Sequence, residues 1–331
     1  MIRRALAFLF ALGLASALLA VWILTPHAVP GGPVFVDIPK GSGVRQIGRL
    51  LADRGVIQHP LELLLVRVLR PKSKLKAGEY LFERPASAWD VFGRVARGDI
   101  FYYALAVPEG NNTFDIAQSI EKLGIMPAAA FLAAARNPEL VRDLDPRAPS
   151  LEGYLFPDTY HVTRHSTPAQ LCHQMTERFR KAWGQLGAPP AAVHHTVTLA
   201  SLIEKEAKLP EEQPLIASVF ANRLRLGMAL QCDPTAIYAA ELEDRYRGTI
   251  HRSDLESKQL YNTYQHAGLP PGPIASPGMA ALRAALAPAA TDYLYFVARG
   301  DGSGTHQFSK ELAQHARAVQ QYRRGLRDQA N

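Results

Sequence analysis

The chain has 331 residues, of which 47% are hydrophobic and 20% charged, so it is long enough for two or three folded domains and ordinary in composition. Its formal charge of +7 comes from 37 basic and 30 acidic residues spread along the chain. Because no basic block with interleaved aromatic residues occurs, nucleic-acid binding is not supported, whereas an anionic polymer or a membrane surface suits this charge. Cys172 and Cys232 lack metal-ligand spacing, and either pair in an oxidising compartment or stay as buried thiols.

An apolar run over residues 5–24 follows Arg3 and Arg4. Its length is that of a helix that crosses a bilayer. The arginines predict that residues 1–4 stay in the cytoplasm and that the bulk of the chain lies on the outer, periplasmic side. A cleaved signal peptide is the alternative, but its apolar core would be shorter, about 7 to 15 residues. We therefore expect a retained single-pass anchor in the cytoplasmic (inner) membrane, followed by a linker over residues 25–33.

Residues 34–126 contain a degenerate repeat whose copies cover 34–57 and 103–126. Each copy reads as an alternating strand, a P-x-G turn, an amphipathic helix and a glycine that ends the helix. Between them, residues 75–82 alternate as a further strand. Small α+β modules of this kind hold an extended ligand or a partner, although two unrelated strand–helix units would give the same pattern.

The rest of the chain is read as mostly helical to residue 197, with an ordered aromatic loop at 150–162. A second amphipathic helix is predicted at 213–226, and the irregular stretch that follows is predicted to be an ordered loop region over 227–280. The chain closes with two short strands and a final helix from Glu311, to which we assign no chemistry beyond a role for His306.

The helical pattern that begins at Leu199 is the sharpest chemical signal. Positions i, i+3, i+4 and i+7 are Leu199, Leu202, Ile203 and Glu206, so Glu206 falls within an apolar stripe, while Glu204 lies about 140° round from Leu199. Desolvation on that face would raise the pKa of the Glu206 carboxyl and make it a general acid near neutrality. The alternative is a surface helix whose carboxylates meet solvent or form i,i+4 pairs.

Polar and aromatic side chains of the type that a sugar site needs occur around Glu206. They are Tyr154, Asn222, Gln231, Asp233, Thr235, Tyr261, Asn262, Thr263 and Tyr264. No Gly-rich phosphate loop, G-x-S-x-G elbow, H-E-x-x-H motif or Cys cluster occurs, so phosphoryl transfer, hydride transfer and zinc hydrolysis lack their parts. An acid that acts on a glycosidic bond remains.

Four segments, in this order, resemble the endolytic murein transglycosylase family, the YceG-like proteins. They are TLASLIEKEA, VFANRLRLGMALQCDPTAIY, YNTYQHAGLPPGPIASPG and YLYFVARGDGSGTHQF. The resemblance covers essentially the whole chain, including the anchor, the LEGYLFPDTY loop and a LysM-like module. The family's catalytic acid, the second glutamate of E-K-E, maps onto Glu206. Ala207 departs from the Ser or Thr that commonly follows the acid in lysozyme-like lytic enzymes, so no hydroxyl acts there.

The resemblance implies an α+β fold with an N-terminal transmembrane helix and two parts, a LysM-like module over 34–100 and a catalytic domain over 101–331, in which 101–126 repeats part of the module. The catalytic glutamate should lie on a buried helix. The implied reaction is lytic cleavage of nascent glycan strands between N-acetylmuramic acid and N-acetylglucosamine. It leaves 1,6-anhydromuramic ends, ends strand elongation and needs no cofactor or metal. Peptidoglycan synthases are implied neighbours.

The sequence leaves the roles of several residues open. Glu204 either assists catalysis or pairs with Lys208, and Asp233 either stabilises positive charge at the anomeric carbon or starts a turn before Pro234. The remaining polar residues are expected to bind substrate in a groove walled by residues 227–280. The alternatives to a lytic enzyme are a hydrolytic muramidase that uses Asp233 as its second carboxylate, and a membrane-anchored wall-binding scaffold without activity.

Overall fold

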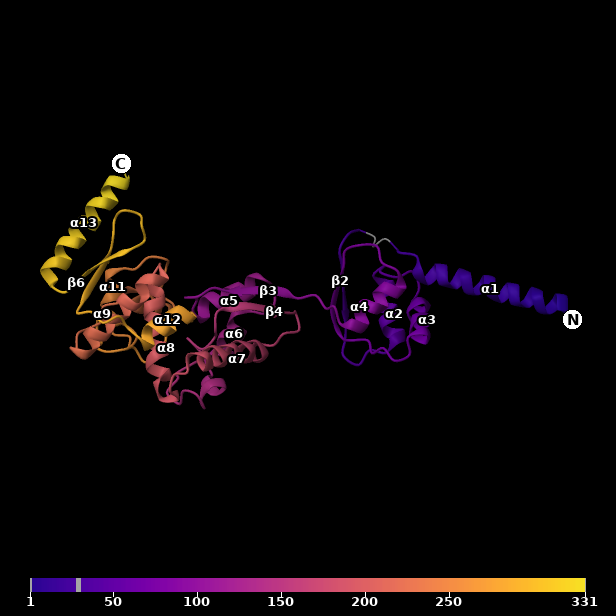
Figure 1. Cartoon of the computed structure of the whole chain (residues 1–331), viewed down its shortest axis with the longest axis horizontal. Coiled ribbons are helices and arrows are strands. Elements are labelled where there is room, and N and C mark those ends of the chain that lie inside the picture. The colour runs from indigo at the N-terminus through magenta and orange to yellow at the C-terminus, as the bar shows by residue number, and fades with distance from the viewer. Residues whose placement is uncertain (1, 28–30, 331) are drawn as a thin grey trace. The chain divides into compact units, whose positions relative to one another are not determined.

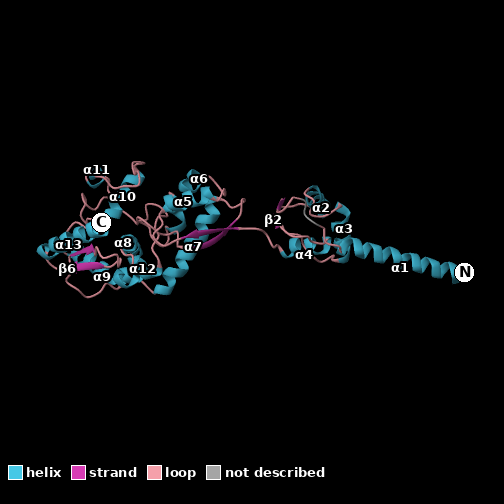
Figure 2. Cartoon of the chain, turned by 90° about the horizontal axis from the view of Figure 1, so that it is seen from above, coloured by secondary structure: helices cyan, strands magenta, loops and turns pink. Residues whose placement is uncertain are grey.

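The computed structural model describes residues 2–27 and 31–330 and forms two compact units, Met1–Tyr103 and Ala104–Asn331 (Figure 1). Its described strands form three separate two-stranded sheets, β1–β2, β3–β4 and β5–β6, and helices make up most of the rest (Figure 2). This mixture of helices and strands agrees with the predicted α+β class. The predicted cytoplasmic tail and linker include residues 1 and 28–30, which lie outside the described residues.

The N-terminal apolar run forms one helix, α1 (Ile2–Leu24), whose length and composition allow it to cross a membrane. Most of its large side chains are exposed. Its last turn differs, because Ile23 is buried and the Trp22 ring lies 6.5 Å from that of His59. The C-terminal end of α1 therefore packs on the first unit, where it contacts α3 (Pro60–Leu69) and α4 (Ala88–Arg97).

The rest of the first unit is a strand–helix–helix–strand arrangement followed by α4. β1 (Val34–Ile38) pairs antiparallel with β2 (Gly78–Phe82), and Val34 lies opposite Phe82. Between them come α2 (Val44–Asp53) and α3, which pack on each other. Alternate strand residues and the apolar helix stripes share one core, which includes Val36, Ile38, Ile47, Leu51, Leu63, Tyr80, Phe82 and Phe92.

Short polar signals fix where these helices begin. Ser87 accepts the backbone N–H of Asp90 and Asp90 accepts that of Ser87, which forms a capping box at the start of α4. Asn112 and Asp115 do the same for α5 (Thr113–Lys122). Each box satisfies backbone donors that have no partner inside the helix.

Both copies of the predicted repeat are strand–turn–helix units. The first is β1–α2 and the second is β3 (Tyr103–Val107) followed by α5. Gly41 and Gly110 have φ of 84° and 79° in the two turns, a conformation that L side chains rarely adopt. The copies lie in different units, since the boundary falls after Tyr103.

The second unit begins with β3, α5, α6 (Ala128–Ala135), a 3₁₀ turn η1 (Pro138–Val141), β4 (Asp158–Val162) and α7 (Pro168–Leu186). β4 pairs with β3. This corrects the prediction of a loop throughout 150–162, because the last five residues form a strand with Tyr160 and Val162 buried. The alternation in DTYHV is a strand pattern that the neighbouring Gly and Pro obscured.

The remainder of the second unit is helical around α8 (Val193–Glu206), which packs on α9 (Gln213–Arg225), α10 (Asp233–Leu242) and α12 (Met279–Leu286). Two 3₁₀ turns, η2 (Pro190–Ala192) and η3 (Pro210–Glu212), precede α8 and α9, and α11 (Arg252–Leu255) follows α10. The predicted second amphipathic helix is confirmed as α9. The chain ends with the antiparallel hairpin β5 (Tyr295–Ala298) and β6 (His306–Ser309), on which α13 (Leu312–Ala330) packs.

Candidate active site

α8 is a core helix that ends at the carboxyl group of interest. Leu199, Leu202 and Ile203 are each at most 1% exposed, so the apolar stripe predicted from the sequence faces the interior. The helix stops because Ala207 takes an extended conformation with φ −84° and ψ 119°. Glu206 is therefore the last helical residue, one turn beyond the buried run 196–203, and its side chain is half buried.

The surroundings of Glu206 favour the protonated acid. Burial, with a smaller contribution from the negative charge of Asp233, raises the pKa of Glu206 from 4.5 to about 7. A hydrogen bond from the Cys232 thiol acts in the opposite direction. Both the protonated and the ionised form of Glu206 are consequently populated near neutral pH. A general acid that must be reprotonated in each turnover requires this.

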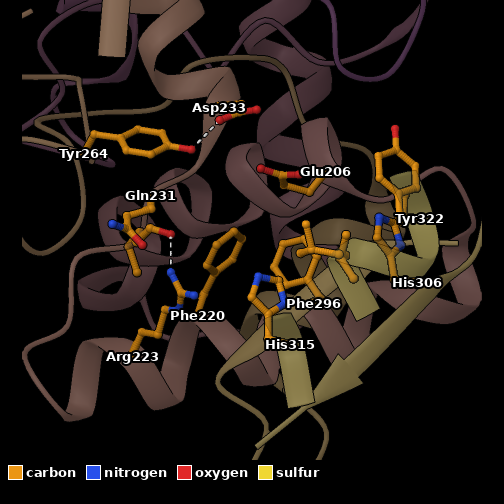
Figure 3. A pocket seen from close by; sticks show the side chains of 14 residues that line it. Glu206, Phe220, Arg223, Gln231, Asp233, Tyr264, Phe296, His306, His315 and Tyr322 are labelled. Atoms are coloured by element: carbon orange, nitrogen blue, oxygen red, sulfur yellow. Dashed lines mark hydrogen bonds between the residues drawn. The ribbon is translucent and has the colours of Figure 1, made fainter. Parts of the chain in front are cut away.

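Asp233 lies on the same cavity as Glu206 and is held by an aromatic hydroxyl. It is the first residue of α10, and its Oδ1 accepts a hydrogen bond from Tyr264 Oη at 2.5 Å (Figure 3). The preceding Gln231 has φ 50°, a left-handed conformation that costs a non-glycine residue roughly 1 kcal/mol. This strained conformation of Gln231 redirects the backbone between Leu230 and the start of α10, next to Glu206.

These groups line a cavity of about 400 Å³, within the size range of small-ligand sites. The cavity wall comes from α8, α9, the start of α10, β5, β6 and α13. Its lining residues are Glu206, Phe220, Arg223, Leu230, Gln231, Asp233, Tyr264, Phe296, Val297, Ala298, His306, His315, Val319 and Tyr322 (Figure 3). In Figure 3, Asp233 lies to one side of Glu206, and His306 and Tyr322 lie to the other. Rings and polar groups are thus interleaved around one acid, as a saccharide requires.

A buried cation holds two walls of this cavity together. The Arg223 side chain donates from Nε to the Leu294 carbonyl at 2.7 Å, and from Nη1 to the carbonyls of Ala229 and Leu230 at 3.2 and 2.9 Å. Burial lowers the pKa of Arg223 from its usual range. Because backbone carbonyls occupy its Nε and Nη1 donors, we assign this guanidinium to supporting the loop before Gln231 and the start of β5.

Glu204 does not line the cavity of Glu206. Its carboxylate accepts the backbone N–H of Gly278 at 3.0 Å, and burial raises its pKa, with Glu109 adding to the rise. The next residue, Lys205, donates to the carbonyl of Gly110 at 3.1 Å. The end of α8 is thus tied to the turn of the second repeat copy. A catalytic assist from Glu204 stays a prediction, and its contacts are those of a structural link.

Two further predicted site residues, Thr235 and Thr263, are buried behind the cavity. Their hydroxyls hydrogen-bond each other at 2.8 Å, and Thr263 Oγ1 also accepts the backbone N–H of Cys232 at 3.0 Å. They hold the turn that presents Asp233, so their contribution to the site is indirect. Both cysteines of the chain are buried and free, and burial raises the pKa of the Cys232 thiol well above its usual value.

The remaining predicted substrate ligands lie away from this cavity. Asn222 donates to the carbonyls of Thr291 and Tyr293, and the fully buried Asn262 donates to three carbonyls between residues 254 and 257. Tyr154 is buried and donates to Asp145. In segments without regular secondary structure, backbone carbonyls lack the partners that a helix or sheet provides, and amide side chains can donate hydrogen bonds to them. The sequence pattern could not separate this use from sugar binding.

Tyr261 lies elsewhere in the second unit, on another cavity of about 530 Å³. Its ring is 5.1 Å from that of Tyr238, which lies midway along α10. Of the nine predicted side chains around Glu206, the structure brings Gln231, Asp233 and Tyr264 to the acid. The role of the others as substrate ligands stays a prediction.

Sequence reasoning missed the contribution of the C-terminal hairpin. Phe296, His315 and Tyr322 line the cavity, although the hairpin and last helix were expected to be structural only. The signal available was the aromatic alternation in YLYFVA followed by a histidine on the partner strand, His306, for which a role had been left open. None of the described residues forms a group of three or more His, Cys, Asp or Glu side chains that could hold a metal ion.

The site is of the general-acid class, with one half-buried carboxyl, a second carboxylate on the same cavity and an aromatic, polar wall. Comparison with known proteins gives the family. The YceG-like family model matches residues 36–321, so the chain belongs to the YceG-like family.

Named relatives span most of the chain. The endolytic murein transglycosylase of Bacillus subtilis (strain 168) is 31% identical over 309 residues, covering 87% of this chain and 84% of that protein. The protein of the same name from Streptococcus pneumoniae serotype 2 (strain D39 / NCTC 7466) is 30% identical over 300 residues, covering 80% of this chain and 54% of its own length. The chain therefore spans about half of the streptococcal relative.

A solved structure also resembles this chain. The crystal structure of a putative YceG-like protein from Listeria monocytogenes superposes with a TM-score of 0.55 at 31% sequence identity. The match covers 86% of this chain and 98% of the Listeria chain.

Proposed function

We propose that this chain is an endolytic murein transglycosylase, a lyase that cuts peptidoglycan glycan strands between N-acetylmuramic acid and N-acetylglucosamine. Membership of the YceG-like family and the names of its relatives support this function. The single observation that carries the assignment to a site is Glu206, an acid with a pKa of about 7 on a cavity lined by rings and hydrogen-bonding groups.

The reaction uses Glu206 at both of its stages. The protonated carboxyl gives its proton to the leaving glycosidic oxygen as the bond from that oxygen to the muramyl C1 breaks. The muramyl C6 hydroxyl then attacks C1, and its proton restores Glu206. The product is a 1,6-anhydromuramic end, and no water is consumed. One acid is enough because the nucleophile belongs to the substrate and is present at high effective concentration.

Asp233 is the group best placed to stabilise the positive charge that develops at C1. Its Oδ1 is fixed by Tyr264, and the carboxylate lies on the same cavity as Glu206. The same position favours the rival reaction, a hydrolytic muramidase in which Asp233 activates water. The two reactions differ in whether water enters the product.

The test of the reaction is the mass of the products formed by the full chain in detergent. Glycan strands are digested in H₂¹⁸O and the new ends are analysed by mass spectrometry. Lytic cleavage gives anhydro ends that are one water lighter than reducing ends and carry no ¹⁸O. Reducing ends that carry ¹⁸O would make the protein a muramidase, and no cleavage at all would favour a wall-binding scaffold.

The first unit extends the proposal to binding and location. The order β1–α2–α3–β2 with antiparallel pairing of the two strands supports a LysM-like module for glycan strands over residues 34–100, ahead of a catalytic domain over 101–331. The helix α1 supports a single-pass anchor in the inner membrane, with residues 1–4 in the cytoplasm and the bulk of the chain on the periplasmic side. Cleavage there would end elongation of nascent strands beside the synthases that make them.

A further inference from the structure

One histidine on the cavity of Glu206 is held by a carboxylate from another element. His306 begins β6, and Glu212 ends η3 just before α9. The Glu212 carboxylate accepts the backbone N–H of His306 at 2.9 Å through Oε1, and lies 2.7 Å from His306 Nδ1 through Oε2. The two side chains are 9% and 13% exposed. A nearly buried carboxylate that bonds both the backbone and the ring fixes the orientation of the imidazole.

This contact also determines which ring nitrogen is free for chemistry. Because the carboxylate occupies Nδ1, that nitrogen carries the hydrogen, and Nε2 of the neutral ring is left with its lone pair. No hydrogen bond from a residue in the described ranges 2–27 and 31–330 reaches Nε2. The ring packs edge-on against Phe296, with centroids 5.5 Å apart, and lines the same cavity as Glu206 (Figure 3).

We propose that His306 binds the muramyl C6 hydroxyl through Nε2 and accepts its proton during cleavage, with Glu212 as its positioning residue; this rests on the proposed lytic function. As the C1–O4 bond breaks, O4 takes the proton of Glu206. As the C1–O6 bond forms, the O6 proton passes to Nε2. The imidazolium, balanced by the Glu212 carboxylate, then returns that proton to the Glu206 carboxylate, and both groups regain their starting states.

The proposal explains how a single acid directs an intramolecular attack instead of hydrolysis. The hydroxyl O6 must approach C1 at the moment when O4 leaves, and a hydrogen bond from O6 to a fixed acceptor orients it. Glu206 has just one proton to give, so a second group that holds the O6 proton separates acid and base roles in time. His306 and Glu206 approach the cavity from different elements, β6 and α8, as reaction at two different oxygens requires.

The chain supplies a matched control for loss of a buried histidine–carboxylate pair. His194 Nδ1 lies 2.7 Å from Asp145 Oδ2, with side chains 14% and 1% exposed, and neither residue lines the cavity of Glu206. His194→Ala therefore reproduces the packing loss of His306→Ala elsewhere in the second unit. Thermal unfolding of both variants of the full chain shows whether each is folded.

The experiment measures cleavage rate and product type for wild type, His306→Ala, Glu212→Gln and His194→Ala in detergent. We expect His306→Ala to lower kcat by about a hundredfold or more with little change in KM, and free imidazole to restore part of that loss. Glu212→Gln should lower kcat about tenfold, because the amide can still accept from the ring but carries no charge. In both variants the share of reducing ends should rise, because water competes with a poorly oriented O6.

Three results would overturn the inference while leaving the lytic function intact. These are His306→Ala with a kcat within about threefold of His194→Ala, an unchanged ratio of anhydro to reducing ends, or a folded His306→Ala variant that imidazole does not rescue. If His306→Ala does not fold, a fully active Glu212→Gln has the same consequence. Failure of the proposed function would look different, since wild type itself would then release no anhydro ends.

Discussion

Two glutamates of the second unit show how burial tunes a carboxyl. Burial raises the pKa of both Glu206 and Glu152 to about 7. Glu152 is 1% exposed and accepts hydrogen bonds from the backbone and hydroxyl of Thr113 and from Tyr238, while its Oε1 has no partner among the described residues. Glu206 instead opens on a cavity that includes a second carboxylate. The same physical effect therefore gives an internal structural acid in one case and an accessible one in the other.

The raised pKa of Glu206 predicts the alkaline limb of the pH–rate profile. The general acid must carry its proton, so kcat/KM should fall about tenfold per pH unit above about pH 7, where Glu206 ionises. Initial rates between pH 5 and 9 measure this. A rate that stays constant to pH 9 would show that the Glu206 proton is not used in the chemistry.

Glu152 predicts a pH dependence of stability rather than of activity. Its folded-state pKa of about 7 exceeds the unfolded value of 4.5, so the folded protein binds more protons between these values. The stabilisation from Glu152 is thus complete below about pH 4.5 and is lost as the pH rises through 7, a change on the order of 3 kcal/mol. Glu152→Gln should flatten this part of the stability curve and be more stable than wild type at pH 8.

Denaturant unfolding at several pH values measures the effect of Glu152→Gln. A surface variant, Glu311→Gln, gives the effect of removing one exposed charge. If the Glu152→Gln curve runs parallel to that of wild type between pH 5 and 8, burial of Glu152 is not what perturbs its titration.

At the scale of elements, local sequence explains α8 and the repeat units but not the cavity. Leu199, Leu202 and Ile203 define one face of the helix by their spacing. Glu206 follows Leu199 at i+7, about two turns later, so it falls on the same face. The cavity needs β5, β6 and α13 to meet α8, and their sequence positions are about a hundred residues away. The aromatic alternation in YLYFVA indicates a strand but not which helix that strand meets, so the sequence alone does not place Phe296 and Tyr322 at the site.

The contacts of the polar loop residues could not be predicted from the sequence for a related reason. Asn262 has the side chain that a sugar ligand needs, but the same amide can satisfy carbonyls of an irregular loop, and burial decides between the two. Only the tertiary structure shows that Asn262 faces inward, while Gln231 and Asp233 face the cavity.

The loop before β4 depends on one close contact with the α8 region. Gly153 has φ 82°, and a Cβ there would come within 2.4 Å of Pro273 Cβ and 3.0 Å of Val197 in α8. Gly153→Ala combines backbone strain with a clash against a rigid ring, and should cost roughly 3 kcal/mol or more of stability. The midpoint of denaturant unfolding measures this.

A control variant at a second glycine, Gly124, separates the effect of the clash from that of backbone strain. Gly124 also has a positive φ, 68°, but a Cβ there meets nothing within 4 Å. Gly124→Ala should therefore lower the stability only through backbone strain, by about 1 kcal/mol. Equal losses for the two variants would mean that the contact with Pro273 does not constrain the loop.

At the scale of the whole molecule, the two units predict separable tasks. Every residue that lines the Glu206 cavity lies in Ala104–Asn331, so this unit holds the complete candidate site. We expect residues 104–331 to fold alone and to cleave short soluble glycan with a kcat within about threefold of the full chain. Loss of the first unit, for which we propose a LysM-like module and an anchor, should raise KM on long strands, because avidity is lost.

Steady-state kinetics on short and long strands measure that separation, with circular dichroism to establish folding of the fragment. A folded fragment without activity on any strand would contradict it and would assign part of the chemistry to the first unit.

The most direct test of the central claim is the rate at which new anhydromuramyl ends form with wild type, Glu206→Gln and Glu204→Gln. The two variants change glutamates two residues apart, one on the cavity and one bonded to Gly278. The assignment of Glu206 as the general acid predicts that Glu206→Gln loses at least about a thousandfold in rate and Glu204→Gln no more than about tenfold. Anhydro ends formed at the wild-type rate by Glu206→Gln would contradict it.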